Sequence, residues 1–151
     1  MNEEFDYKQV PFQYIHCFNA GCTKADVCLR YLAGQHVPHT LPYLMCVNPA
    51  TYPTGKATCT HFRTTEKIRL AWGLKNICDN VSYRTACAIR KQVKTLFTKS
   101  TYYRILHEER ALTPADQRAI AQVFVRHGVT TSPTYTRYTE EYDWEVFNER
   151  R

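Results

Sequence analysis

The sequence predicts a mainly α protein: a helical bundle with a small irregular, partly β, cysteine-rich lobe at its N-terminal end. Apolar residues recur at spacings of three and four between residues 64 and 128, which is the period of amphipathic helices. Before residue 62 the chain is instead rich in Cys, Pro, His and aromatic residues. We therefore expect a lobe at residues 1–62, a basic helical domain at 63–128, and an acidic, aromatic tail at 129–151 that docks on the helical domain.

The N-terminal lobe offers one short helix and one short strand. Thr23 and Asp26 resemble an N-cap followed by an acidic first turn, so we expect a helix at about residues 24–33 that carries Cys28 and ends near Gly34. The apolar run 41–47 predicts a strand. The segment after it contains Pro and Gly and predicts a loop.

Four further helices are expected in the second part, each preceded by a Ser or Thr that can act as an N-cap. These capping residues are Thr64 or Thr65, Ser82, Ser100 and Thr113. The first helix should end near residue 77, with Ile68 and Leu74 on its apolar stripe, and the third near Leu106. Pro114 is preset for the first turn of the fourth helix, and Gly128 closes that helix.

Positive charge is concentrated in the middle of the chain. Residues 63–110 hold eleven Lys or Arg and four Asp or Glu, so this segment has a net charge of +7. The rest of the chain has a net charge of −1, and the whole chain has +6. A basic block inside a folded half is expected of a protein that binds a nucleic-acid backbone. The alternative is a basic surface that only keeps the protein soluble.

The N-terminus has neither a basic segment nor an apolar one, so it predicts no signal peptide. No run approaches the length of about 18 apolar residues that a membrane span needs. The seven cysteines are an odd number, whereas secreted disulfide frameworks usually have an even one. We therefore expect a cytoplasmic protein with reduced thiols and no membrane contact.

The cysteines of the lobe are spaced as candidate metal ligands. The predicted ligands are Cys17, Cys22, Cys28 and Cys59. Sets of thiolates select zinc or iron–sulfur clusters over hard cations, and we expect zinc, with an iron–sulfur cluster or no metal as alternatives. Other candidates for the fourth ligand are His61, His16 and Cys46, of which Cys46 lies in the expected apolar strand. Cys78 and Cys87 are expected in the helical core.

A second motif lies in the basic half, where a polar cap precedes a short helix ending in Arg104-Ile105 and Thr113-Pro114 starts the next helix. Residues 83–128 thereby resemble the second half of a phage-repressor-like helix-turn-helix. The resemblance implies contacts of the short helix with a DNA major groove or with flanking phosphates. The candidate nucleic-acid-binding residues are Arg90, Lys94, Lys99, Ser100, Thr101, Tyr103, Arg104 and Arg110.

Several distinct motifs are spread along nearly the whole chain, together with Cys22. They are His16-Cys17-Phe-Asn, Cys28-Leu-Arg, Asn48-Pro-Ala-x-Tyr-Pro, Lys67-Ile-Arg-x-Ala-Trp72-Gly, Thr101-Tyr-Tyr-Arg104, Glu109-Arg-x-Leu-Thr-Pro114 and Tyr138-Thr-Glu-Glu-Tyr142. In these features the chain resembles a family of uncharacterised bacterial proteins of about this length. That resemblance implies no function.

Taken together, the sequence predicts a regulatory protein that binds DNA or RNA and has a structural metal site. One alternative is a redox-responsive regulator that uses the same cysteines. Another is an interaction adaptor whose basic face meets an acidic partner protein. We expect no enzyme activity, because the chain has no glycine-rich phosphate loop and Cys59 and His61 are too close in sequence to align readily as nucleophile and base.

Overall fold

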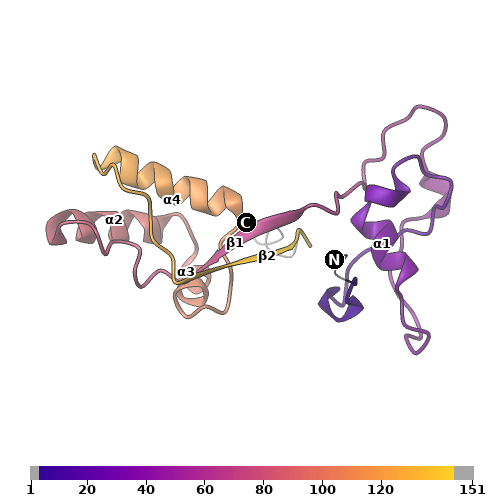
Figure 1. The fold of residues 1–151 in the computed structure, drawn as a ribbon, viewed down its shortest axis with the longest axis horizontal. Coiled ribbons are helices and arrows are strands. Elements are labelled where there is room, and N and C mark those ends of the chain that lie inside the picture. The colour runs from indigo at the N-terminus through magenta and orange to yellow at the C-terminus, as the bar shows by residue number, and fades with distance from the viewer. Residues whose placement is uncertain (1–3, 145–151) are drawn as a thin grey trace. The chain divides into compact units, whose positions relative to one another are not determined.

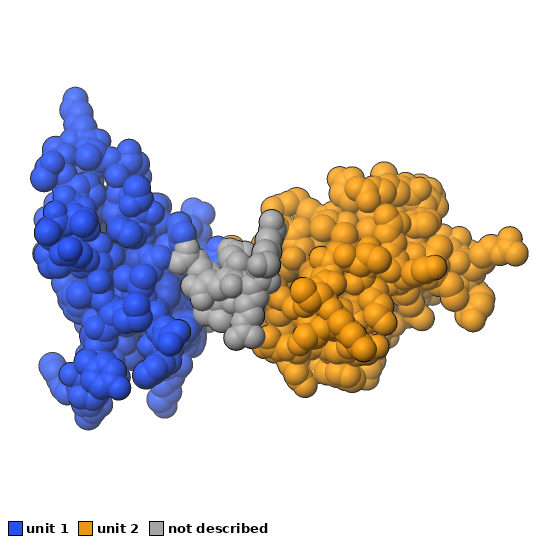
Figure 2. Space-filling model, turned by 180° about the vertical axis from the view of Figure 1, so that it is seen from behind, with its two compact units in different colours: residues 1–67, 142–151 blue, residues 68–141 orange. Residues whose placement is uncertain are grey.

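The computed structural model describes residues 4–144. The chain forms two compact units, unit 1 at residues 1–67 with 142–151 and unit 2 at residues 68–141 (Figure 2). Unit 2 is thus inserted into the sequence of unit 1. Within the described part of the chain, no helix combines the length and the apolar character that a bilayer crossing requires.

The fold is mixed α/β, and the expected helical bundle is wrong. The described residues are 35% helical and 12% β, with four α-helices and a two-stranded antiparallel sheet (Figure 1). Strand β1 (Lys67–Trp72) pairs with β2 (Arg137–Tyr142). Strand β1 occupies the segment in which the sequence predicted the first helix of the basic half.

Backbone pairing explains why residues 67–72 are extended. Ala71 and Leu112 exchange two backbone hydrogen bonds, of 3.1 and 2.8 Å. The indole N–H of Trp72 donates to Thr139 Oγ1 at 2.9 Å. Gly73 then ends the strand at φ +81°, where a Cβ would overlap the side chain of Thr136. The apolar residues 68–78 therefore belong to a strand and the turn after it.

The other three helices expected in the basic half are confirmed as α2 (Tyr83–Thr95), α3 (Lys99–Leu106) and α4 (Pro114–Arg126). Helix α4 begins with a capping box: Thr113 Oγ1 accepts the Asp116 N–H at 3.2 Å, and Asp116 Oδ2 accepts the Thr113 N–H at 3.0 Å. Helix α3 is capped by Thr98, whose hydroxyl accepts the Thr101 N–H, and not by Ser100. Gly128 follows α4 at φ +70°.

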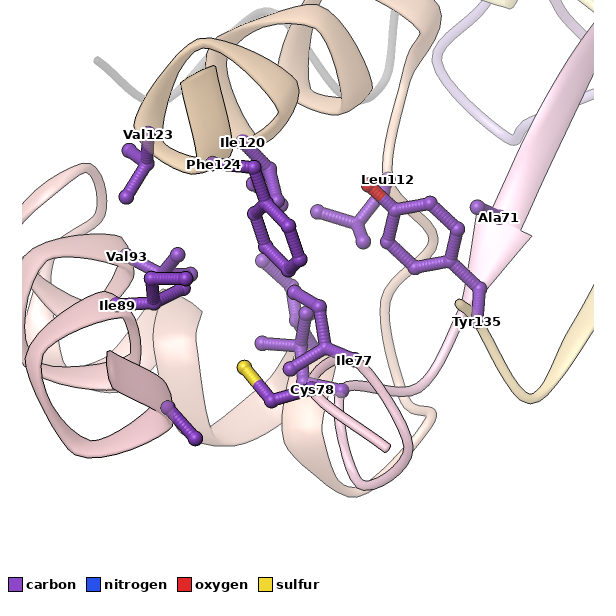
Figure 3. Close-up of a cluster of buried hydrophobic side chains, with 13 residues drawn as sticks. Ala71, Ile77, Cys78, Ile89, Val93, Leu112, Ile120, Val123, Phe124 and Tyr135 are labelled. Atoms are coloured by element: carbon purple, nitrogen blue, oxygen red, sulfur yellow. The ribbon is translucent and has the colours of Figure 1, made fainter. Parts of the chain in front are cut away.

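The core of unit 2 lies between these helices and β1. Its buried side chains include Ile89, Val93, Leu112, Ile120, Val123 and Phe124 (Figure 3). Cys78 is buried here as predicted, whereas Cys87 is exposed. Tyr135 enters the same core, and burial raises the pKa of its hydroxyl far above the ordinary 10.0. That hydroxyl has no hydrogen-bond partner among the described residues.

Unit 1 is built mostly of turns around one short helix, α1 (Leu29–Gln35), which follows a 3-10 turn at Ala25–Val27. The strand expected at 41–47 is absent, and its place is taken by a single parallel bridge between His16 and Cys46. Further 3-10 turns lie at Tyr7–Gln9 and Pro49–Thr51.

Residues from both ends of the described chain build the core of unit 1. Its buried members are Tyr14, Leu29, Ala33 and Trp144. Trp144 meets the Tyr14 ring edge-on at a centroid distance of 5.0 Å. Of the acidic, aromatic tail that the sequence predicts, residues 137–142 form β2 and Trp144 joins this core, while Phe147 lies outside the described residues.

Candidate metal centre

Four cysteines line one small cavity in unit 1. They are Cys17, Cys22, Cys28 and Cys59, the four ligands that the sequence predicts. The cavity offers ≈ 20 Å³ to the centre of a water-sized sphere. This is room for about one water molecule or one ion. Arg30, Tyr52 and His61 share its wall.

A tight turn folds the first part of the cavity wall. Asn19 Oδ1 accepts the Gly21 N–H at 3.2 Å, and the Asn19 carbonyl accepts the Cys22 N–H at 3.2 Å. An Asn side chain that binds the backbone two residues on is a local turn-forming interaction. The turn reverses the chain between Cys17 and Cys22, and the 3-10 turn that follows returns it to Cys28, the N-cap residue of α1.

Cys59 reaches the cavity because the segment after it pairs with the segment around Cys28. The Leu29 N–H donates to the Arg63 carbonyl at 2.7 Å, and a second hydrogen bond of 3.1 Å joins the same two segments in antiparallel pairing. Two parts of the chain that are distant in sequence are thus fixed beside each other, and both contribute thiols to one wall.

Arg30 is the charged residue that ties these segments together. The residue is 6% exposed. Its Nε donates to the His61 carbonyl at 2.8 Å, and its Nη1 donates to the Ile15 carbonyl at 3.0 Å. Its own carbonyl accepts the Cys17 N–H at 3.0 Å. One buried guanidinium therefore links the segments that carry Cys17 and Cys59 and places a positive charge in the cavity wall.

The surroundings of Cys17 act on its thiol in opposite directions. Burial raises the pKa of Cys17 most, and the nearby thiols, Cys28 foremost, raise it further, because a second negative charge close by is unfavourable. The Asn19 backbone N–H hydrogen-bonds to the sulfur and opposes this rise. A cation held among the thiols would favour the Cys17 thiolate, because it would offset the cost of burying the charge and the repulsion from the neighbouring thiolates.

Tyr52 forms the outer support of Cys17. Its hydroxyl hydrogen-bonds to the Cys17 sulfur and accepts the Phe18 N–H, and its pKa is raised, chiefly by burial. Hydrogen bonds of this kind orient metal ligands in proteins. Neither Tyr52 nor Arg30 was found by sequence reasoning. An arginine on a short helix and a tyrosine in a loop carry no signal of their role until their burial and contacts are known.

The contacts of the alternative ligands show which of them could still serve as the fourth ligand. His16 is 2% exposed, and both ring nitrogens are engaged, Nε2 by the Tyr7 hydroxyl at 2.8 Å and Nδ1 by the Met45 carbonyl at 3.1 Å. Cys46 is exposed and lies outside the cavity wall, so its expected burial in a strand is wrong. His61 lies in the cavity wall and therefore remains a candidate for the fourth ligand.

The thiols line the cavity without standing at ligand distances. Among residues 4–144, no three or more His, Cys, Asp or Glu side chains form a metal-binding group. Metal binding by the four cysteines therefore stays a prediction, supported by their shared cavity.

The predicted nucleic-acid-binding residues lie on unit 2 around α2 and α3. Those exposed to solvent are Arg90, Lys94, Lys99, Ser100, Tyr103 and Arg104. Thr101 and Arg110 are partly buried. The structure brings two of these residues together, because Lys94 Nζ lies 3.4 Å from the Tyr103 hydroxyl and 5.2 Å from the centre of its ring. Arg90 donates to the Lys75 carbonyl at 3.4 Å.

Comparisons with curated proteins and with solved structures gave no match. The model of a family of unknown function, DUF6078, matches residues 1–144. This agrees with the resemblance to an uncharacterised family that the sequence motifs indicated. Since the match covers nearly the whole chain, the protein belongs to the DUF6078 family of unknown function.

Proposed function

We propose that this protein is a nucleic-acid-binding protein in which unit 1 is stabilised by one zinc ion held by Cys17, Cys22, Cys28 and Cys59. The observation that carries the metal site is the meeting of four thiols from distant parts of the sequence on one ion-sized cavity. Unit 1 consists mostly of turns and has a small apolar core, so a metal would supply stability that its burial alone does not.

We propose zinc in preference to an iron–sulfur cluster, because the role proposed for the site is to stabilise unit 1, and this role needs no redox-active metal. Zinc takes four thiolates in a closed structural site. Four thiolates and one Zn²⁺ carry a net charge of −2, and the Arg30 guanidinium in the same wall is positioned to offset part of that charge.

Elemental analysis of the full chain, purified without oxygen and dialysed against a weak chelator, tests the metal site. We expect about one zinc per chain in the wild type, and less than about half of that in Cys59→Ser, because a structural site needs all four ligands. The exposed Cys87→Ser is the matched control and should keep its zinc. A metal-free wild type, or equal zinc loss in both variants, contradicts the proposal.

Nucleic-acid binding is proposed for unit 2 from the geometry of α2 and α3. A connection of three residues, 96–98, joins the two helices, and helix-turn-helix motifs use turns of about this length. Exposed basic side chains stand on both helices, at Arg90 and Lys94 on α2 and at Lys99 and Arg104 on α3. Such a surface neutralises phosphates and releases counterions.

Band-shift titrations of a mixed-sequence duplex and of a single-stranded RNA at two salt concentrations test this part. We expect salt-dependent binding that weakens in Arg104→Ala, with a smaller salt slope because one phosphate contact is lost. Arg118→Ala, an exposed change on α4, is the control and should bind as the wild type does. Binding that is absent or insensitive to salt rejects the nucleic-acid role and leaves an acidic protein as the partner of the basic surface.

The proposal assigns no reaction to the protein. It places the protein in the cytoplasm, because four reduced thiols persist in a reducing compartment. Fractionation of cells that express the untagged chain would test the location.

A further inference from the structure

A second, larger cavity adjoins the thiol cavity of unit 1. It has a volume of ≈ 470 Å³ and is lined by residues of segments 19–24 and 53–59. Two of the four cysteines, Cys22 and Cys59, line both cavities, whereas Cys17 and Cys28 line the inner one. The wall between the two spaces is therefore formed in part by one pair of thiols.

The other two thiols do not line the outer cavity, although Cys17, like Cys22 and Cys59, is only partly buried. Cys28 is 8% exposed. The sulfur of Cys17 is hydrogen-bonded by the Asn19 N–H and the Tyr52 hydroxyl. An ion held among the four thiols would occupy part of the inner cavity. A small molecule that enters the outer cavity consequently meets Cys22 and Cys59 first.

The outer cavity is open to solvent, and part of its lining is polar or basic. Lys24 and Lys56 lie in its wall with Thr23 and Thr58. Lys24 is held over the Phe62 ring, with its Nζ 4.7 Å from the ring centre. With a metal bound, both lysines would favour the negative charge of a four-thiolate site.

We propose that Cys22 and Cys59 are the oxidation site of unit 1, and that a peroxide entering the outer cavity joins them in a disulfide and releases the zinc ion. This inference rests on the proposed zinc site. Thiolates bound to a metal remain nucleophilic, and their oxidation follows their exposure. The pair that faces the larger cavity is therefore the pair that reacts.

The reaction balances in two steps. One thiolate attacks hydrogen peroxide, which yields a sulfenic acid and hydroxide. The second thiolate attacks the sulfenic sulfur, forms the S–S bond and expels a second hydroxide. The two thiolates together lose two electrons, the peroxide is reduced to two hydroxide ions, and two protons from the buffer convert these into two water molecules. The zinc ion loses two of its four ligands and dissociates from Cys17 and Cys28.

The test uses the full chain with Cys46→Ser and Cys87→Ser, which removes the two exposed thiols outside the site. The protein is loaded with zinc without oxygen and its zinc content is measured before any peroxide is added. Hydrogen peroxide is then added, zinc release is followed with a colorimetric chelator, and disulfides are mapped by mass spectrometry. We expect two thiols lost per zinc released and Cys22–Cys59 as the first disulfide.

The outcomes separate the two proposals. Failure to load zinc rejects the proposed metal site and this inference with it. Zinc that loads but stays bound while thiols are oxidised, or a first disulfide that includes Cys17 or Cys28, rejects this inference alone.

A variant that fills the outer cavity gives a second test. Ala57 lines the outer cavity, so Ala57→Trp should leave zinc content unchanged and slow peroxide-driven release about tenfold, because it reduces access to the pair. Ala50→Trp adds the same ring at an exposed residue that lines neither cavity, and it should release zinc at the wild-type rate. Equal release rates in the two variants contradict the inference.

Discussion

At the scale of single residues, helix α1 supports the thiol cavity from two positions. Arg30 links the carbonyls of Ile15 and His61, and Gly34 lies so close to the segment of Cys17 that a Cβ would overlap its carbonyl oxygen. The Arg30 side chain holds the cavity segments together. Gly34 has no side chain, which lets the backbone of α1 lie close to the segment of Cys17.

Replacing Arg30 by Met should destabilise unit 1 by about 2–4 kcal/mol, because two hydrogen bonds from a charged donor are lost and two buried carbonyls lose partners. Urea unfolding followed by the amide signals of unit 1 measures this effect. Lys8→Met, at an exposed lysine, is the control and should change stability by less than about 0.5 kcal/mol. Equal stability of the two variants would show that Arg30 does not hold the unit together.

Tyr135→Phe should stabilise unit 2 by about 1 kcal/mol at neutral pH, because the buried hydroxyl lacks a hydrogen-bond partner. The phenol ionises at its ordinary pKa of 10.0 in the unfolded chain and stays protonated in the fold. The folded state therefore binds more protons above pH 10, and stability falls there by up to about 1.4 kcal/mol per pH unit.

The stability of wild type and Tyr135→Phe, measured by denaturant unfolding between pH 7 and pH 11, checks both effects. The difference between the two proteins should grow above pH 10. Tyr83→Phe removes the hydroxyl of a tyrosine that is 86% exposed and should leave the curve of the wild type unchanged. A constant difference across the pH range would contradict a buried, protonated Tyr135.

At the scale of elements, side-chain caps mark where α3 and α4 begin. Helix α3 starts at Lys99 because the Thr98 hydroxyl accepts the Thr101 N–H, although Ser100 is also a good capping residue by type. Thr98→Ala should therefore cost about 1 kcal/mol, and Ser100→Ala less than about 0.5 kcal/mol. Thermal or urea unfolding of the two variants measures the difference in stability. A larger loss of stability in Ser100→Ala would show that Ser100, and not Thr98, caps the helix.

The accuracy of the sequence predictions depends on the range of the interactions involved. Thr113, Pro114 and Gly128 mark α4 correctly because their effects act within a few residues. Strand β1 was missed because its partner, β2, lies far along the chain, and local periodicity carries no record of that pairing.

The residues of the candidate site also differ in whether the sequence could identify them. The cysteines could be selected from the sequence because thiols are rare and chemically distinct, and four of them do line one cavity. The roles of Arg30 and Tyr52 could not be predicted. They depend on burial and on contacts with segments distant in sequence.

At the scale of the whole molecule, the two units have separate cores. We therefore expect two unfolding transitions, of which the one for unit 1 depends on zinc. Addition of a strong chelator should lower the midpoint of that transition and leave the transition of unit 2 in place, because a metal stabilises the state that binds it. Scanning calorimetry with and without zinc measures both, and a chelator that shifts both transitions equally would contradict the assignment of the metal to unit 1.

The insertion of unit 2 into unit 1 has a consequence for the order of events on the ribosome. Trp144 completes the core formed with Tyr14 and Leu29, yet it is synthesised after all of residues 68–141. Unit 2 has every residue of its core available before Trp144 emerges. We therefore expect unit 1, whose first residues are translated first, to finish folding after unit 2. Its cysteines remain in an incompletely folded unit until Trp144 has been synthesised.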